Sequence, residues 1–188
     1  MALTLFSRNG YYGTSMSDLA KALGLSKAAL YKHFESKGEI RSCLFDSIQS
    51  YYDAHFGSME HLPEIPESKE GLISLTMHMA QFTIHDERVV KVRRMLTIEQ
   101  FHDVRACALA TRHLLTEIEG IFAEIFKAMM DKNLLKRDDP SILALSYTEP
   151  ISILIRLSDR EPEREQEVLE RIRAFAEHFL SVYGGTRP

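Results

Sequence analysis

The sequence has few of the residues on which several classes of protein depend. Its 188 residues include no tryptophan, two cysteines, nine glycines and six prolines. The two cysteines, Cys43 and Cys107, have no metal-ligand spacing, which argues against a disulfide framework or a structural zinc site. We therefore expect a cytoplasmic protein that holds no metal and no cofactor.

Long apolar runs and an export signal are also lacking. The most apolar stretch, from Ser141 to Leu157, is interrupted by Glu149 and Pro150, and a membrane span needs roughly 18 apolar residues. The opening letters MALTLF carry no basic residue of the kind that begins a signal peptide. We expect no membrane partner.

The chain as a whole lacks the positive charge of many nucleic-acid-binding proteins. Its formal net charge is -4 at pH 7. Residues 1–47, however, hold six Lys or Arg against four Asp or Glu, so they carry +2 and the remainder carries -6. This asymmetry favours a basic head on an acidic body.

Apolar residues recur at intervals of three and four, and the alternation typical of strands is absent. The pattern predicts an all-α fold of about nine helices. We expect a head over residues 1–46 and a helical body over residues 47–188, with the boundary inside the fourth helix. The expected helices cover about 2–8, 15–23, 27–34, 37–59, 69–85, 87–99, 103–133, 140–157 and 162–183.

The stretch from Ser15 to Lys37 has the pattern of a helix-turn-helix. Ser15 and Asp18 have capping-box spacing, Gly24 suits a left-handed turn, and Ser26 is the next candidate N-cap. A small core is expected from Leu19, Ala20, Leu23, Leu25 and Leu30.

A recognition helix enters the major groove with its N-terminal end, which favours short or polar residues there. Lys27 can reach a base edge or a phosphate, and the alanines after it allow close approach. Hydroxyl, ammonium and imidazole groups further along are suitable phosphate donors. We predict DNA contacts from Thr14, Ser15, Ser26, Lys27, Ala28, Ala29, Tyr31, Lys32, His33 and Lys37. The alternative is that the hairpin has a purely structural role in an enzyme or a carrier, with Tyr31 and His33 in packing roles.

The segment LFSRNGYYGTSMSDLAKALGLSKAALYKHFESKGEI, from Leu5 to Ile40, resembles the DNA-binding head of the tetracycline-repressor (TetR) family of bacterial transcription regulators. The letters LYKHFESK carry the most specific part of this likeness, which covers roughly a fifth of the chain. The resemblance implies a nine-helix homodimer whose remaining domain binds a small-molecule effector.

The body offers candidates for an effector site and for dimerisation. Polar and apolar side chains mix between Glu87 and His102, which suits a pocket wall, although each residue could equally be core or solvated surface. The candidate lining residues are Phe56, His78, Met79, Phe82, Arg94, Met95, Ile98, Phe101, His102, Phe122 and Tyr147. The apolar surface of the last two helices, about 140–183, predicts a homodimer through a four-helix bundle.

No nucleophile constellation, catalytic carboxylate pair or phosphate-binding glycine loop is visible, so we do not expect an enzyme. The favoured hypothesis is a dimeric, ligand-responsive repressor that binds a palindromic operator in double-stranded DNA. Two alternatives stay open: a helical ligand carrier or enzyme with a vestigial head, and a DNA-bound architectural factor without a small-molecule effector.

Overall fold

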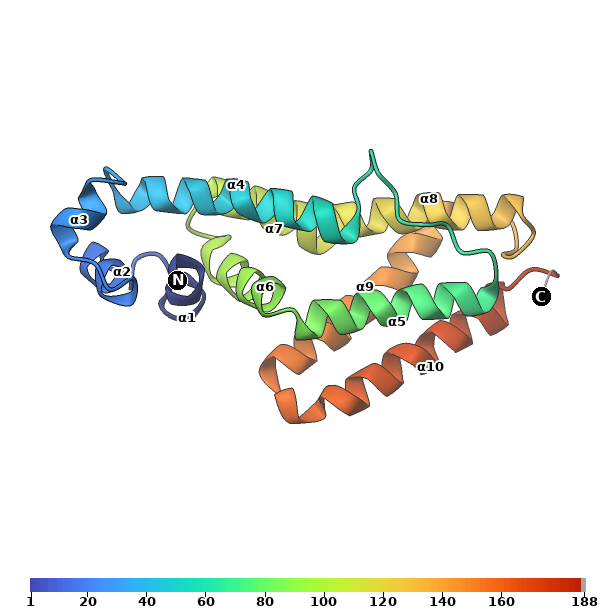
Figure 1. The fold of residues 1–188 in the computed structure, drawn as a ribbon. Coiled ribbons are helices and arrows are strands. Elements are labelled where there is room, and N and C mark those ends of the chain that lie inside the picture. Colours follow the sequence, from blue (N-terminus) through green and yellow to red (C-terminus); the bar gives the residue numbers. More distant parts are fainter. Residues whose placement is uncertain (187–188) are drawn as a thin grey trace. The chain divides into compact units, whose positions relative to one another are not determined.

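The computed structural model describes residues 1–186, which form helices joined mostly by short loops (Figure 1). The described residues contain no named strand, only an isolated bridge between Leu135 and Gly184. This confirms the predicted all-α class. The helices are α1 (Ala2–Asn9), α2 (Met16–Ala22), α3 (Lys27–Tyr31), α4 (Lys37–Phe56), α5 (Lys69–His85), α6 (Glu87–Glu99), α7 (Val104–Thr111), α8 (Glu117–Asp131), α9 (Pro140–Arg160) and α10 (Glu165–Tyr183).

The predicted helix over residues 103–133 contains a π-helical turn, Arg112–Thr116, which joins α7 to α8. Such a turn inserts extra backbone and shifts the helical register, so side chains on either side of it face different directions. Counted as one continuous run, α7 and α8 bring the helices of the described residues to the predicted nine. None of these helices is both long enough and apolar enough to span a bilayer.

The chain forms two compact units. One comprises Met1–His55 with Glu87–Arg112, and the other comprises Phe56–Asp86 with the residues from His113 onward. The helices α6 and α7 thus belong to the same unit as the head. The predicted boundary at residue 46 separates the part of the chain that binds DNA from the rest. The division into compact units does not test which part binds DNA, so this boundary stays a prediction.

In the first unit, α1 packs against α6, and ion pairs link α4 to α7 and to the residues directly before and after it. Partner numbers rise together along the two helices, so α4 and α7 run in the same direction. Most of these side chains are partly exposed, and each such pair contributes only about 0–1 kcal/mol. The pairs are Arg41–Asp103 at 2.8 Å, Asp46–Arg105, and Asp53–Arg112 at 3.2 Å.

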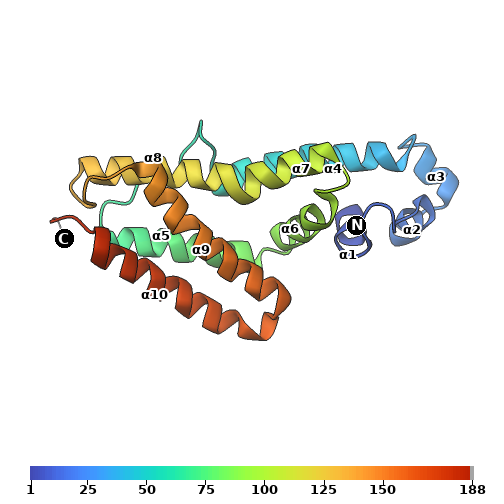
Figure 2. The same cartoon turned by 180° about the vertical axis from the view of Figure 1, so that it is seen from behind.

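The second unit is built on an aromatic core in which α5, α9 and α10 pack together and α8 packs on α9 (Figure 2). Tyr147 is fully buried, with its ring 5.3 Å from that of Phe126 and 4.6 Å from that of Phe179. Its hydroxyl lies 2.7 Å from the Thr76 hydroxyl. Burial raises the pKa of Tyr147 to about 12, and the Thr76 hydrogen bond opposes this rise.

Candidate nucleic-acid interface

The first helix of the predicted motif begins with a complete capping box. The Asp18 N–H donates to Ser15 Oγ at 3.1 Å, and the Ser15 N–H donates to Asp18 Oδ2 at 2.8 Å. The Ser15 hydroxyl also donates to Asp18 Oδ2 at 2.6 Å, and these hydrogen bonds lower the pKa of Asp18. The start of α2 is thereby fixed by its own sequence.

The turn between α2 and α3 follows the predicted chemistry. Gly24 has φ +68°, the left-handed region that glycine adopts without steric cost. The Leu25 N–H donates to the Ala20 carbonyl at 2.9 Å, and the Ala29 N–H donates to Ser26 Oγ at 3.1 Å. The predicted cap at Ser26 is thus confirmed, and α3 begins at Lys27.

Three of the five residues expected in the core of the motif are buried, namely Leu19, Ala20 and Leu30. Leu23 and Leu25 are 46% and 41% exposed, so the prediction for these two leucines was wrong. The physical reason is that α2 ends at Ala22. Both leucines therefore lie on the turn, where the helical period no longer directs side chains inward.

The outer surface of α3 carries most of the predicted DNA contacts. Lys27 and Ala28, at its first turn, are exposed, and Tyr31 is 45% exposed. Lys32 and His33 follow and are also exposed. A short, well-capped helix thus presents small residues at its start and hydrogen-bond donors beyond them, which is the arrangement that major-groove reading requires.

Thr14 does not share that surface. Its side chain is buried and its hydroxyl donates to the Gly10 carbonyl at 2.9 Å. A hydroxyl with this partner, 1% exposed, fastens the turn before α2 and is not available to a phosphate. The prediction of a DNA contact from the Thr14 side chain is therefore corrected, while the exposed Ser15 stays a candidate.

Lys37, predicted to contact phosphate, makes internal hydrogen bonds at the start of α4. Its ammonium donates to the carbonyl oxygens of Tyr11 and Thr14, each at 2.6 Å. It also lies 4.1 Å from the centre of the Tyr11 ring, and the Arg41 guanidinium lies 4.0 Å from the same ring. An ammonium has three donors, so a phosphate contact stays a prediction beside this structural role.

Glu99, at the end of α6, is the residue of this region whose role the sequence did not reveal. It is 2% exposed and accepts a hydrogen bond from the Tyr11 N–H at 2.7 Å. The signal was present, because Glu99 continues the buried stripe of Val92 and Leu96. A carboxylate on an apolar stripe needs a partner, but the pattern does not say which one.

The predicted effector residues fall into both units. In the first, Met95 is buried, whereas Arg94, Ile98, His102 and the 82% exposed Phe101 are at the surface. The His102 ring lies 6.4 Å from that of Tyr12.

In the second unit, Phe122 and Tyr147 belong to the aromatic core, with ring centres 5.4 Å apart, and the Phe56 and Phe82 rings are 5.3 Å apart. His78 is exposed and Met79 half-buried. An effector role for all of these residues stays a prediction.

The comparisons with known proteins agree with this geometry. Residues 1–42 match the family described as bacterial regulatory proteins, tetR family. The negative transcriptional regulator IcaR of the biofilm operon icaADBC in Staphylococcus epidermidis is 27% identical over 155 residues, which cover 82% of this chain and 74% of that one. Its namesake in Staphylococcus aureus strain Newman is 45% identical over 53 residues, which cover 26% of this chain and 28% of that one.

Among solved structures, the TetR family transcriptional regulator PfmR from Thermus thermophilus superposes with a TM-score of 0.63 at 25% identity, covering 100% of this chain and 97% of that one. The capped motif, its exposed second helix and these similarities define a helix-turn-helix DNA-binding transcriptional regulator. Over its first 42 residues the chain is similar to the TetR family, and its fold is similar to that of a TetR family regulator.

Proposed function

We propose that this regulator is a ligand-responsive repressor that binds a palindromic operator as a homodimer. DNA binding is supported by the exposed start of α3, which the Ser26 cap and the Gly24 turn hold in place. Ala28 would face base edges, and Lys27, Tyr31, Lys32 and His33 would donate to phosphates on either side.

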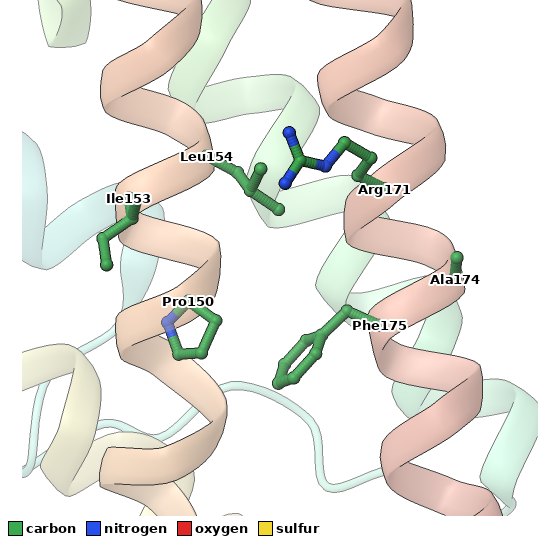
Figure 3. A pocket seen from close by; sticks show the side chains of 6 residues that line it. All are labelled: Pro150, Ile153, Leu154, Arg171, Ala174 and Phe175. Atoms are coloured by element: carbon green, nitrogen blue, oxygen red, sulfur yellow. The ribbon is translucent and has the colours of Figure 1, made fainter.

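Homodimerisation is proposed through α9 and α10 because both present apolar surface. On α9, Ile142, Leu145 and Ile153 lie along one stripe and are 61%, 44% and 61% exposed. Beside this stripe α9 and α10 border a shallow hollow (Figure 3). It is lined by Pro150, Ile153, Leu154, Arg171, Ala174 and Phe175.

Such a face is costly to leave in water and suits a copy of itself. A homodimer has two heads, one for each half-site of a palindromic operator. Two half-sites about one helical turn apart, roughly 34–36 Å between centres, are then expected.

Repression is supported by the printed name of the Staphylococcus epidermidis relative, which is a negative regulator. Effector responsiveness is proposed from the similarity to the TetR family. The effector must bind the released form more tightly than the DNA-bound form, since a ligand of equal affinity for both shifts nothing.

The test is selection of DNA from a random-sequence library by the purified wild-type chain. Enrichment of sequences with two inverted half-sites is the expected outcome. Enrichment of none, with only weak salt-sensitive binding, would favour a carrier or enzyme with a vestigial head. An enriched site from which no metabolite in a release screen displaces the protein would favour the architectural alternative.

A further inference from the structure

The connection between α1 and α2 is held from two sides at Tyr11. From α6, the Glu99 carboxylate accepts a hydrogen bond from the Tyr11 N–H at 2.7 Å. From α4, the Lys37 ammonium donates a hydrogen bond to the Tyr11 carbonyl at 2.6 Å. One residue of the head is thus fastened to two helices outside the helix-turn-helix.

The backbone at this point is shaped to receive the carboxylate. Gly10 has φ +70°, and a Cβ built on it would lie 3.1 Å from Glu99 Oε1 and 3.4 Å from Ile98 Cγ2. A side chain at residue 10 would therefore be strained in conformation and would crowd α6. The Gly10 position lets the chain approach α6 closely enough for the hydrogen bond.

Glu99 is also almost completely buried, which a hydrogen bond to the Tyr11 N–H does not by itself require. It is 2% exposed, and its second oxygen, Oε2, has no hydrogen-bond partner among the described residues. A buried carboxylate with an unsatisfied oxygen is costly. Packing therefore does not explain a carboxylate on the inner face of α6, whereas the hydrogen bond that Oε1 accepts from the Tyr11 N–H does.

The other end of α6 is fastened to α4. Arg88 Nη2 donates to the Ser47 carbonyl at 2.9 Å, and its guanidinium lies 4.2 Å from the centre of the Tyr51 ring. Arg88 and Glu99 are eleven residues apart on one helix, which at 1.5 Å per residue is about 16 Å. A rigid α6 therefore connects the middle of α4 to the α1–α2 connection.

We propose that Glu99 is a positioning residue for operator binding, which fixes the head to α6 through the Tyr11 N–H and so sets where α3 stands relative to α4. This inference rests on the proposed function, because its consequence is a fixed distance between the two recognition helices, α3 of each copy, in a dimer. Removing the carboxylate should make that distance variable while leaving the DNA-contacting surface of α3 intact.

The experiment repeats the DNA selection with Glu99→Ala, Glu99→Gln and the control Thr97→Ala, an exposed position on the same helix. For Glu99→Ala we expect about tenfold weaker binding to the operator selected by the wild type, and a spread of enriched half-site spacings. Glu99→Gln keeps an acceptor oxygen and should restore the single spacing. Thr97→Ala should match the wild type.

The outcomes separate the two proposals. Wild-type chain that enriches no paired half-sites overturns the proposed function and this inference with it. Paired half-sites whose spacing stays unique in Glu99→Ala overturn the inference alone, even if affinity and thermal stability fall, because a purely structural role lowers both without widening the spacing.

A second measurement covers the case in which Glu99→Ala does not fold. Amide hydrogen exchange on the wild-type chain should show the Tyr11 N–H protected about 100-fold or more relative to an unstructured peptide. Exchange of this amide at the unstructured rate would show that the Glu99 hydrogen bond does not hold the connection, and would overturn the inference.

Discussion

The ammonium of Lys37 lies 2.6 Å from the carbonyl oxygen of Tyr11, so a lysine from the first turn of α4 closes the connection that precedes the helix-turn-helix. A second bond, to the Thr14 carbonyl, has the same length. The side chain therefore stabilises the head whether or not DNA is present.

The first prediction follows from these two bonds. Lys37→Met keeps the aliphatic stem and removes a donor from two carbonyls, of which that of Tyr11 keeps the Thr14 N–H at 3.3 Å, so the free energy of unfolding should fall by about 1–2 kcal/mol. Lys32→Met, at an exposed position, should change it by less than about 0.5 kcal/mol. Urea denaturation without DNA measures both. Equal stability of the two variants would mean that the ammonium is dispensable to the fold.

The second prediction concerns Lys27, exposed at the start of α3. Lys27→Ala should weaken binding to the selected operator about tenfold and reduce the slope of log Kd against log salt concentration by about 1, because one phosphate-neutralising charge is lost. Lys127→Ala removes an exposed lysine from α8 and should leave both quantities unchanged. An unaltered salt slope for Lys27→Ala would remove that residue from the interface.

Local signals in the sequence were enough to predict the motif itself. The Ser15 and Ser26 caps and the Gly24 turn depend on residues only a few positions away, and each was predicted correctly. Leu23 and Leu25 were wrongly assigned to the core, because the exact end of the helix decides which residues follow the helical period and which lie on the turn. Periodicity predicts a helix reliably and its last residue poorly.

The long-range contacts could not be predicted in the same way. Lys37 and Glu99 reach Tyr11 from 26 and 88 positions away. The sequence shows a cation after a turn and an acid on an apolar stripe, but the partner of each is chosen by tertiary packing. The assignment of Thr14 to DNA failed for a related reason, since its hydroxyl is taken up by the Gly10 carbonyl.

The third prediction tests the core of the second unit. In Tyr147→Phe, Thr76 Oγ1 still donates to the Leu72 carbonyl at 2.8 Å, so the loss of the Tyr147 hydroxyl should cost about 1 kcal/mol of stability near pH 7. Thr76→Val should cost more, because it leaves the buried Tyr147 hydroxyl without its partner. Chemical denaturation of both variants gives the comparison, and a smaller loss for Thr76→Val would contradict it.

The same tyrosine makes stability depend on alkaline pH. Its pKa is raised to about 12 in the folded chain from 10.0. The unfolded chain therefore loses this proton first, and the contribution is complete below pH 10 and is lost as the pH rises toward 12. The wild type should lose up to about 2–3 kcal/mol more than Tyr147→Phe over this range. Parallel stability curves for the two proteins would show that the hydroxyl titrates normally.

The fourth prediction tests the proposed dimer face. Ile153 is 61% exposed on α9 beside the hollow that α9 shares with α10 (Figure 3). Ile153→Lys would place a charge in the middle of an apolar interface, where burying it without a partner is costly, so dimer affinity should fall about tenfold or more. Val104→Lys changes an 88% exposed apolar residue of the other unit and should leave the dimer intact. Sedimentation velocity at micromolar concentration separates dimer from monomer, with circular dichroism confirming that both variants remain helical. Two variants that sediment alike as dimers would show that this face is not the interface, and a monomeric wild type would remove the dimer altogether.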